Sequence, residues 1–148
     1  MRTNRFEIFS TSIAQLIKSV QYLKSKKMAQ YNLKGTTALC LCQILDSDDG
    51  LTAGELSVLG EIDKAQVSRC MSDLTERGFV CRQEETGRYK QKYRLTEKGR
   101  AAAEDISAAV LRVQRAVTED ISEQEINAFY NTLYKLCENF SALLDQEK

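Results

Sequence analysis

The spacing of the apolar residues changes at Gly78, and this change restricts the possible folds more than any other feature of the chain. Before Gly78, four apolar residues follow the i, i+3, i+4, i+7 spacing of one helical face: Val67, Cys70, Met71 and Leu74. After it, Glu-Glu-Thr-Gly-Arg separates a short segment at 79–83 from residues 89–95, which alternate as a strand does. We therefore expect a helix over 64–77, followed by a β-hairpin with Gly87 at its turn.

Another short helix is expected immediately before this one. Thr52-Ala-Gly-Glu55 has the form of a capping box, in which the threonine hydroxyl and the glutamate carboxylate each accept from a free amide of the first turn. The helix can extend to Gly60, whose freedom at positive φ suits a sharp turn, and Asp63 can cap the helix that follows. Helix, tight turn, helix and hairpin predict a winged helix-turn-helix in a mainly α fold with a small β-hairpin wing.

This arrangement is typical of DNA-binding proteins, in which the second helix enters the major groove and the hairpin reaches a neighbouring minor groove or phosphate track. The candidate recognition residues are the exposed ones near the start of the second helix: Lys64, Ala65, Gln66, Ser68 and Arg69. The amide of Gln66 can pair with adenine, Arg69 can reach guanine or a phosphate, and Ser68 is small enough to allow close approach. We call these five residues the recognition edge.

Helix starts offer further candidate contacts to DNA. Thr36 or Thr37 is expected to cap a helix that runs to about Leu45, and Thr52 is expected to cap the next one. The amides at a helix N-terminus are unpaired and carry partial positive charge, so they can hold a phosphate.

The positive charge of the chain is local. The whole chain has 21 basic and 21 acidic residues, whereas residues 77–100 hold eight basic and three acidic ones. Arg88, Lys90 and Lys92 are the expected phosphate contacts of the hairpin, and alternation places Lys90, Lys92 and Arg94 together on an outward face.

Long amphipathic segments flank the winged unit. One covers residues 6–30, a second is expected from Thr96 to about Val117, and a third begins at the capping box Ser122-Glu-Gln-Glu125. A helix of about 25 residues is ~35 to 40 Å long, longer than a small winged lobe, so part of each apolar stripe needs a partner. We expect a single domain over 1–148, with a DNA-binding lobe at about 36–100 and dimerisation helices at about 1–34 and 101–148, giving a homodimer.

The composition argues against an enzyme. The chain has no histidine, and it lacks glycine-rich phosphate loops and clusters of metal ligands, so we expect no catalytic residue, no cofactor and no metal site.

No signal peptide or membrane span is evident, which favours a cytoplasmic protein. Five cysteines without a secretory signal favour reduced thiols, although a redox role for one of them stays open.

The chain resembles the MarR family of bacterial transcription regulators. The resemblance rests on TAGELSVLGEIDKAQVSRCMSDLTERGFV, on RLTEKGR, and on ISEQEINAFYNTLYKLCENF, in the family's order and spacing. It implies a homodimer with interlocked first and last helices, two winged lobes on a pseudo-palindromic operator, and release of the DNA by a small molecule or an oxidant. The family's recognition positions fall on the recognition edge.

Three points keep alternatives open. Many members of the family carry Asp-x-Arg at the wing tip, whereas this chain has Gly87 and Tyr89 there, so Arg88 is the expected substitute. Four tyrosines are either core residues or the lining of an effector pocket: Tyr22, Tyr31, Tyr130 and Tyr134. A winged helix can also be a protein-protein interaction adaptor without DNA binding, and this is the alternative function.

Overall fold

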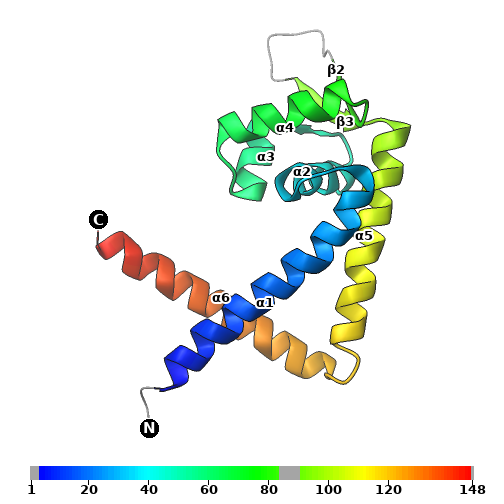
Figure 1. Cartoon of the computed structure of the whole chain (residues 1–148). Coiled ribbons are helices and arrows are strands. Elements are labelled where there is room, and N and C mark those ends of the chain that lie inside the picture. Colours follow the sequence, from blue (N-terminus) through cyan, green and yellow to red (C-terminus); the bar gives the residue numbers. More distant parts are fainter. Residues whose placement is uncertain (1–3, 84–90, 148) are drawn as a thin grey trace. The chain divides into compact units, whose positions relative to one another are not determined.

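The computed structural model describes residues 4–83 and 91–147, which form a mainly helical winged-helix fold with a small antiparallel sheet, as the sequence predicts (Figure 1). Its elements are, in chain order, α1 (Asn4–Met28), η1 (Ala29–Tyr31), α2 (Gly35–Leu45), β1 (Leu51–Thr52), α3 (Ala53–Gly60), α4 (Lys64–Glu76), β2 (Val80–Gln83), β3 (Lys92–Leu95), α5 (Glu97–Val117) and α6 (Glu123–Gln146). The chain divides into two compact parts, Met1–Leu111 and Arg112–Lys148, and the boundary falls inside α5.

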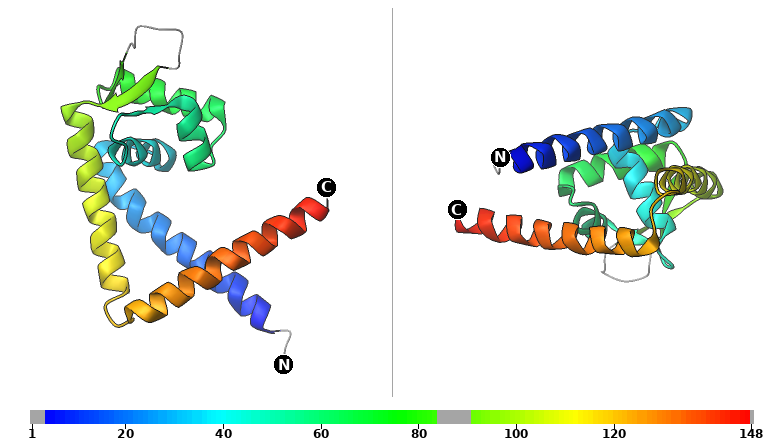
Figure 2. Two further views of the ribbon diagram at one scale, coloured as in Figure 1. Left: turned by 180° about the vertical axis from the view of Figure 1, so that it is seen from behind. Right: turned by 90° about the horizontal axis from the view of Figure 1, so that it is seen from below.

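The core of the first part lies between α2, α3 and α4. Its largest fully buried side chains include Leu41 of α2, Leu56 of α3, and Met71 and Leu74 of α4. Burying one such side chain contributes about 1.5 to 3 kcal/mol. The start of α5 closes the core with Ala102, Ala103 and Ile106, and Figure 2 shows the three short helices and the sheet grouped at this end of α5.

The helix α4 forms as the sequence predicts. The carboxylate of Asp63 accepts from the amide of Gln66 at 2.9 Å and caps the first turn. The predicted apolar stripe is buried, from Val67 to Leu74. The helix ends where Gly78 takes a φ of 76° and the amide of Phe79 donates to the carbonyl of Leu74 at 2.9 Å.

The turn before α4 differs from the prediction. The capping box of Thr52 and Glu55 is present at the start of α3, which confirms that prediction. Gly60, however, is the last helical residue, and Glu61 takes the left-handed conformation with a φ of 50°. The amide of Ile62 donates to the carbonyl of Ser57 at 3.0 Å, so the tight turn forms one residue later than expected.

The sheet has one strand more than the expected hairpin. β3 pairs antiparallel with β2 on one side and with the two-residue β1 on the other, giving the order β1-β3-β2. Val80 lies opposite Leu95, and Leu51 lies opposite Tyr93. The predicted turn at Gly87 lies outside the described residues.

The wing and α5 are joined at one tight contact. The hydroxyl of Thr96 accepts from the amide of Gly99 at 3.0 Å and donates to the carbonyl of Gly78 at 2.6 Å. A Cβ on Gly99 would lie 1.8 Å from the carbonyl oxygen of Phe79. Residue 99 therefore has to be glycine for the first turn of α5 to pack on the start of the wing.

The long helices carry apolar stripes that the single chain leaves exposed. In the described part of α1 only Met28 is buried, and Phe6, Leu16 and Ile17 are at least half exposed. In α6, which the structure describes throughout, no residue is buried, and Phe129 and Leu143 are about half exposed. None of the described helices combines the length and the apolar character needed to cross a bilayer.

Candidate nucleic-acid interface

The recognition edge is exposed on one helix. Lys64, Ala65, Ser68 and Arg69 are exposed on α4, while the stripe from Val67 to Leu74 faces the core. The fold therefore holds α4 by its apolar face and presents polar and basic side chains outward. This is the geometry that base contacts in a major groove require.

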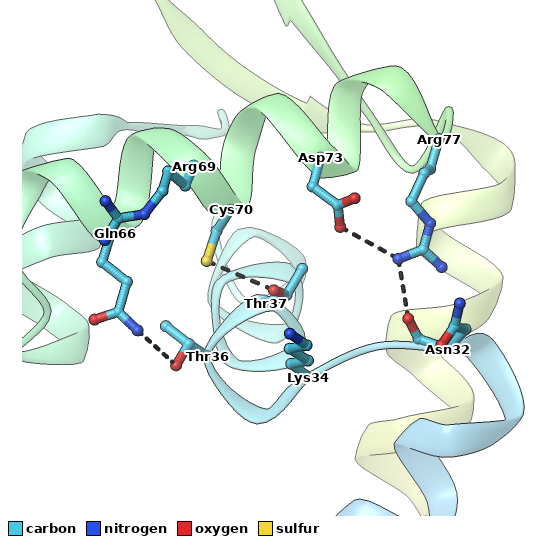
Figure 3. A pocket seen from close by; sticks show the side chains of 9 residues that line it. All are labelled: Asn32, Lys34, Thr36, Thr37, Gln66, Arg69, Cys70, Asp73 and Arg77. Carbon is cyan, nitrogen blue, oxygen red and sulfur yellow. Dashed lines mark hydrogen bonds and ion pairs between the residues drawn. The ribbon is translucent and has the colours of Figure 1, made fainter.

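Gln66 is the exception on this edge. It is half-buried, and its amide nitrogen Nε2 donates to Oγ1 of Thr36 at 3.3 Å (Figure 3). The bond joins α4 to the first turn of α2. The Gln66 amide is therefore already engaged within the protein through one of its two N–H groups.

The threonines at the helix starts do not all serve as predicted. α2 begins at Gly35 with Lys34 at the cap position and no side-chain cap bond, so neither Thr36 nor Thr37 caps it. Thr37 is buried and its hydroxyl donates to Sγ of Cys70 at 3.5 Å, because the first turn of α2 packs against α4. The Thr37 side chain is therefore largely covered, whereas Thr36 is half-buried at the surface, and the phosphate contact at this helix start stays a prediction.

Thr52 is also withdrawn from solvent. It is buried, and its amide donates to the Glu55 carboxylate at 2.8 Å while its hydroxyl accepts from the Glu55 amide at 3.2 Å. Thr52 therefore has its own donors occupied by an anionic side chain. A phosphate contact at this helix start would therefore have to come from the other amides of the first turn, and it stays a prediction.

The base of the wing is paired with an acidic turn that precedes β1. Nζ of Lys92 lies 2.6 Å from Asp49 Oδ2, and the guanidinium of Arg94 pairs with Oδ1 of the same carboxylate. Hydrogen bonding and the positive charge of Lys92, followed by the charge of Arg94, lower the pKa of Asp49. The expected outward cationic face is thus offset by one negative charge here. Arg88 and Lys90 lie outside the described residues.

Asp49 is a residue that the sequence interpretation missed. Its run Asp46-Ser-Asp-Asp-Gly50 indicates a turn, but the ion pairs depend on β1 lying beside β3. A strand of two residues leaves no periodic signal in a sequence.

A pocket of about 510 Å³ lies beside α4 (Figure 3). The connection between η1 and α2, the first turn of α2 and one face of α4 line it with Asn32, Lys34, Thr36, Thr37, Gln66, Arg69, Cys70, Asp73 and Arg77. Three of these side chains are cations and one is an anion. The pocket therefore combines part of the recognition edge with residues that the sequence interpretation did not single out.

Arg77 fixes one end of this pocket. Its guanidinium donates to the carbonyls of Tyr31 at 2.6 Å and Asn32 at 3.0 Å, and it lies 3.2 Å from the carboxylate of Asp73. The hydroxyl of Tyr31 in turn donates to Asp105 of α5 at 2.5 Å, and this bond raises the pKa of the Tyr31 phenol. The end of α4 is thereby tied to η1 and, through Tyr31, to α5.

The tyrosines and cysteines that the sequence singled out differ in exposure, and the cysteines range from buried Cys40 and Cys70 to exposed Cys81 and Cys137. Tyr31 is partly buried and bonded to Asp105, while the other three tyrosines of the suggested effector pocket are exposed on their helices: Tyr22, Tyr130 and Tyr134. Burial, with a smaller contribution from Cys70, raises the pKa of the Cys40 thiol to about 11, which makes it a poor nucleophile. Within residues 4–83 and 91–147, no group of three or more acidic or cysteine side chains is placed to hold a metal ion.

The fold matches many solved structures, although no family model and no curated protein matches the sequence. A MarR family transcriptional regulator from Listeria monocytogenes, solved with a 26mer DNA, is 20% identical with a TM-score of 0.77, over 89% of this chain and 88% of that one. A MarR family regulator from Silicibacter pomeroyi is 24% identical with a TM-score of 0.74, over 94% of both chains.

A third structure is MepR, a transcription regulator of the Staphylococcus aureus multidrug efflux pump MepA. It is 16% identical with a TM-score of 0.69, over 89% of this chain and 98% of that one. The chain therefore has the winged-helix fold of MarR family transcription regulators.

Proposed function

We propose that this chain is a sequence-specific, DNA-binding transcription regulator of the MarR family, acting as a homodimeric repressor in the cytoplasm and not as an enzyme. The observation that carries the proposal is the exposed recognition edge on α4, held by a buried stripe and capped by Asp63. The similarity to the Listeria monocytogenes regulator, which was solved with DNA, supports the same use of the fold here.

In this proposal α4 enters the major groove and the wing contacts the backbone. Arg69 and Ser68 contact base edges or phosphates from the exposed face of the helix, and Gln66 contacts a base after leaving Thr36. The amides at the start of α2 contact a phosphate beside the groove. Lys92 contributes less positive charge than its sequence position suggests, because Asp49 lies 2.6 Å from it.

The apolar stripes of α1 and α6 support dimerisation, and residues 1–34 and 101–148 are the proposed dimerisation helices on either side of a lobe at 36–100. Two-fold symmetry would then place two copies of α4 about one helical turn of DNA apart, ~34 Å, or a multiple of that spacing. Sedimentation equilibrium tests the dimer: the expected mass is about twice the 16.8 kDa of one chain.

Selection from a random DNA library with the full chain tests the function. We expect enrichment of a pseudo-palindromic sequence, with an affinity that falls steeply as salt rises, because neutralised phosphates release counterions. A protein-protein interaction adaptor would enrich no sequence and show no salt-sensitive retention of DNA. The pairing of Lys92 and Arg94 with Asp49 is the observation that favours this second candidate.

A further inference from the structure

The short helix α3 exposes two large apolar side chains on the winged lobe. Val58 is 79% exposed, the highest value for a large apolar side chain in the described part of the chain, and its neighbour Leu59 is 60% exposed. The fold does not need them to hold α3, because Leu56 is fully buried in the core and the capping box fixes the first turn. Both side chains are therefore available to contact another molecule.

The turn after α3 holds this apolar surface in one conformation. The amide of Ile62 donates to the carbonyl of Ser57 at 3.0 Å, and the hydroxyl of Ser57 donates to the carbonyl of Ile62. The partly buried side chain of Ile62 lies against Gly60, where an added Cβ would be 2.6 Å from its Cδ1 atom, so it extends the apolar surface beyond the helix. We call Val58, Leu59 and Ile62 the α3 patch. A surface that is ordered before binding loses little conformational entropy when a partner docks.

The surroundings of the α3 patch are acidic. Residues 36–63, which include β1, α3 and nearly all of α2, hold six acidic residues and no basic one. Glu55 is exposed one turn before the apolar pair, on the same side of α3. Glu61 and Asp63 follow the helix, and neither forms an ion pair with a residue that the structure describes. The negative end of the α3 dipole lies at this end as well, so the rim favours cations.

Charge and position restrict what can cover the α3 patch. An acidic rim repels the phosphates of nucleic acids and of anionic lipids, so the patch suits neither. Figures 1 and 2 place α3 on the opposite side of the lobe from α5, away from this proposed dimerisation helix. The apolar surface requires an apolar anchor and the rim requires cations, and a basic amphipathic helix presents both.

We propose that the α3 patch is a docking surface for a basic amphipathic helix of another protein. The apolar face of that helix covers Val58 and Leu59, and its lysines or arginines lie against Glu61 and Asp63. No residue of the patch belongs to the recognition edge. The contact is therefore additional to the proposed DNA binding and does not depend on it.

A fluorescent synthetic helix of leucine and lysine, about 14 residues or roughly four turns long, tests the surface with the full chain. Anisotropy should show saturable binding, and amide NMR shifts should appear in residues 55–63. A variant with both Val58→Thr and Leu59→Gln should weaken binding by about tenfold or more, because the burial of two apolar side chains is lost. Val58→Ile keeps the apolar area, so it is the matched control and should leave binding unchanged.

Glu61→Asn tests the contribution of the acidic rim. Asparagine tolerates the left-handed conformation that residue 61 adopts, so the charge is removed while the turn is kept. Binding should weaken by about two- to fivefold at low salt, and the difference should shrink as salt rises. Glu76→Gln, which changes an exposed acid at the other end of α4, is the matched control and should have no effect. Thermal unfolding of each variant separates a lost contact from a lost fold.

The proposal fails if the peptide does not saturate, if its shifts map outside residues 55–63, or if Val58→Ile binds as weakly as the double variant. Equal binding of a peptide with glutamate in place of every lysine would also overturn it. A lower oligomeric mass of the double variant would assign the patch to a second copy of the chain. Lost DNA affinity with unchanged peptide binding would assign it to DNA, and either result refutes the proposal. Failure of the DNA selection would refute the regulator and leave the docking surface standing.

Discussion

Gln66 donates to Thr36 at 3.3 Å, so the side chain best suited to read adenine is held against α2 in the DNA-free chain. If a base contact displaces this bond, the net gain is smaller than the gross strength of the new bond. Thr36 is thereby a positioning residue for Gln66.

Gln66→Ala should relax base preference at one position of each half-site. Loss of a paired amide contact costs ~1 to 3 kcal/mol of discrimination, with little change at the other positions. Equilibrium binding to a panel of single-base operator variants measures this. Lys90→Ala is the comparison, and it should weaken binding to all sequences alike. If both variants lost affinity uniformly, base recognition would be assigned to the wrong residue.

Asp49→Asn should strengthen DNA binding without changing its sequence preference. The substitution removes the negative charge that lies against Lys92 and Arg94, so both cations become available to phosphates. The plot of log affinity against log salt should steepen by about one unit for each additional phosphate contact. Fluorescence anisotropy at several salt concentrations measures the slope, and an unchanged slope would mean that the base of the wing does not contact the backbone.

The Asp49 carboxylate should also make the free energy of unfolding depend on pH in the acid range. The pKa of Asp49 is lower in the folded chain than the usual value of about 3.9, so its ion pairs stabilise the fold fully above that value. This contribution is lost as the pH falls through the lower, folded pKa. Urea unfolding of the unmodified chain and of Asp49→Asn should differ by a constant amount near neutrality, and the difference should shrink below about pH 4. A difference that grew on acidification would contradict the assignment.

Arg77→Ala should destabilise the lobe by about 1 to 3 kcal/mol, because two backbone carbonyls and Asp73 lose a charged donor. Arg100→Ala is the control, since Arg100 is well exposed and its nearest pairing, with Glu104, is 3.9 Å long. Chemical denaturation of both variants tests the difference. Equal midpoints would show that the bonds of Arg77 contribute nothing net.

Gly99→Ala should destabilise the chain by about 1 to 3 kcal/mol or more, because the new methyl overlaps the carbonyl of Phe79 and the backbone has to shift. Gly54→Ala, in the first turn of α3, is the matched control. Its methyl would lie 3.9 Å from the nearest atom, and alanine favours a helix, so we expect no loss of stability. Thermal unfolding should therefore show a lower midpoint for Gly99→Ala and an unchanged or higher midpoint for Gly54→Ala.

The sequence predicted the elements that local patterns specify. Asp63 and Ser122 marked helix starts correctly, because a cap depends on residues within one turn. The stripe from Val67 to Leu74 marked the buried face of α4, since 3.6-residue periodicity determines which side chains share a face.

The errors concern contacts between segments far apart in the chain. The pairing of Asp49 with Lys92 and Arg94 requires the β1–β3 register, and the burial of Thr37 requires α2 to pack on α4. The left-handed residue of the turn is Glu61 and not Gly60, and the bond from the Ile62 amide to the Ser57 carbonyl that closes the turn joins residues beyond the local glycine signal. The sequence predicted that the recognition edge is exposed, but it did not predict that Thr36 is the hydrogen-bond partner of Gln66.

The contact of Gly99 with Phe79 also has a mechanical consequence. The carbonyl of Phe79 accepts from the amide of Thr96 at 3.1 Å, and no side chain separates the two backbones. Phe79, the residue before β2, and the first turn of α5 are consequently in direct backbone contact. A displacement of the first turn of α5 would therefore bear directly on the backbone at the start of the wing, with no side chain between them to absorb it.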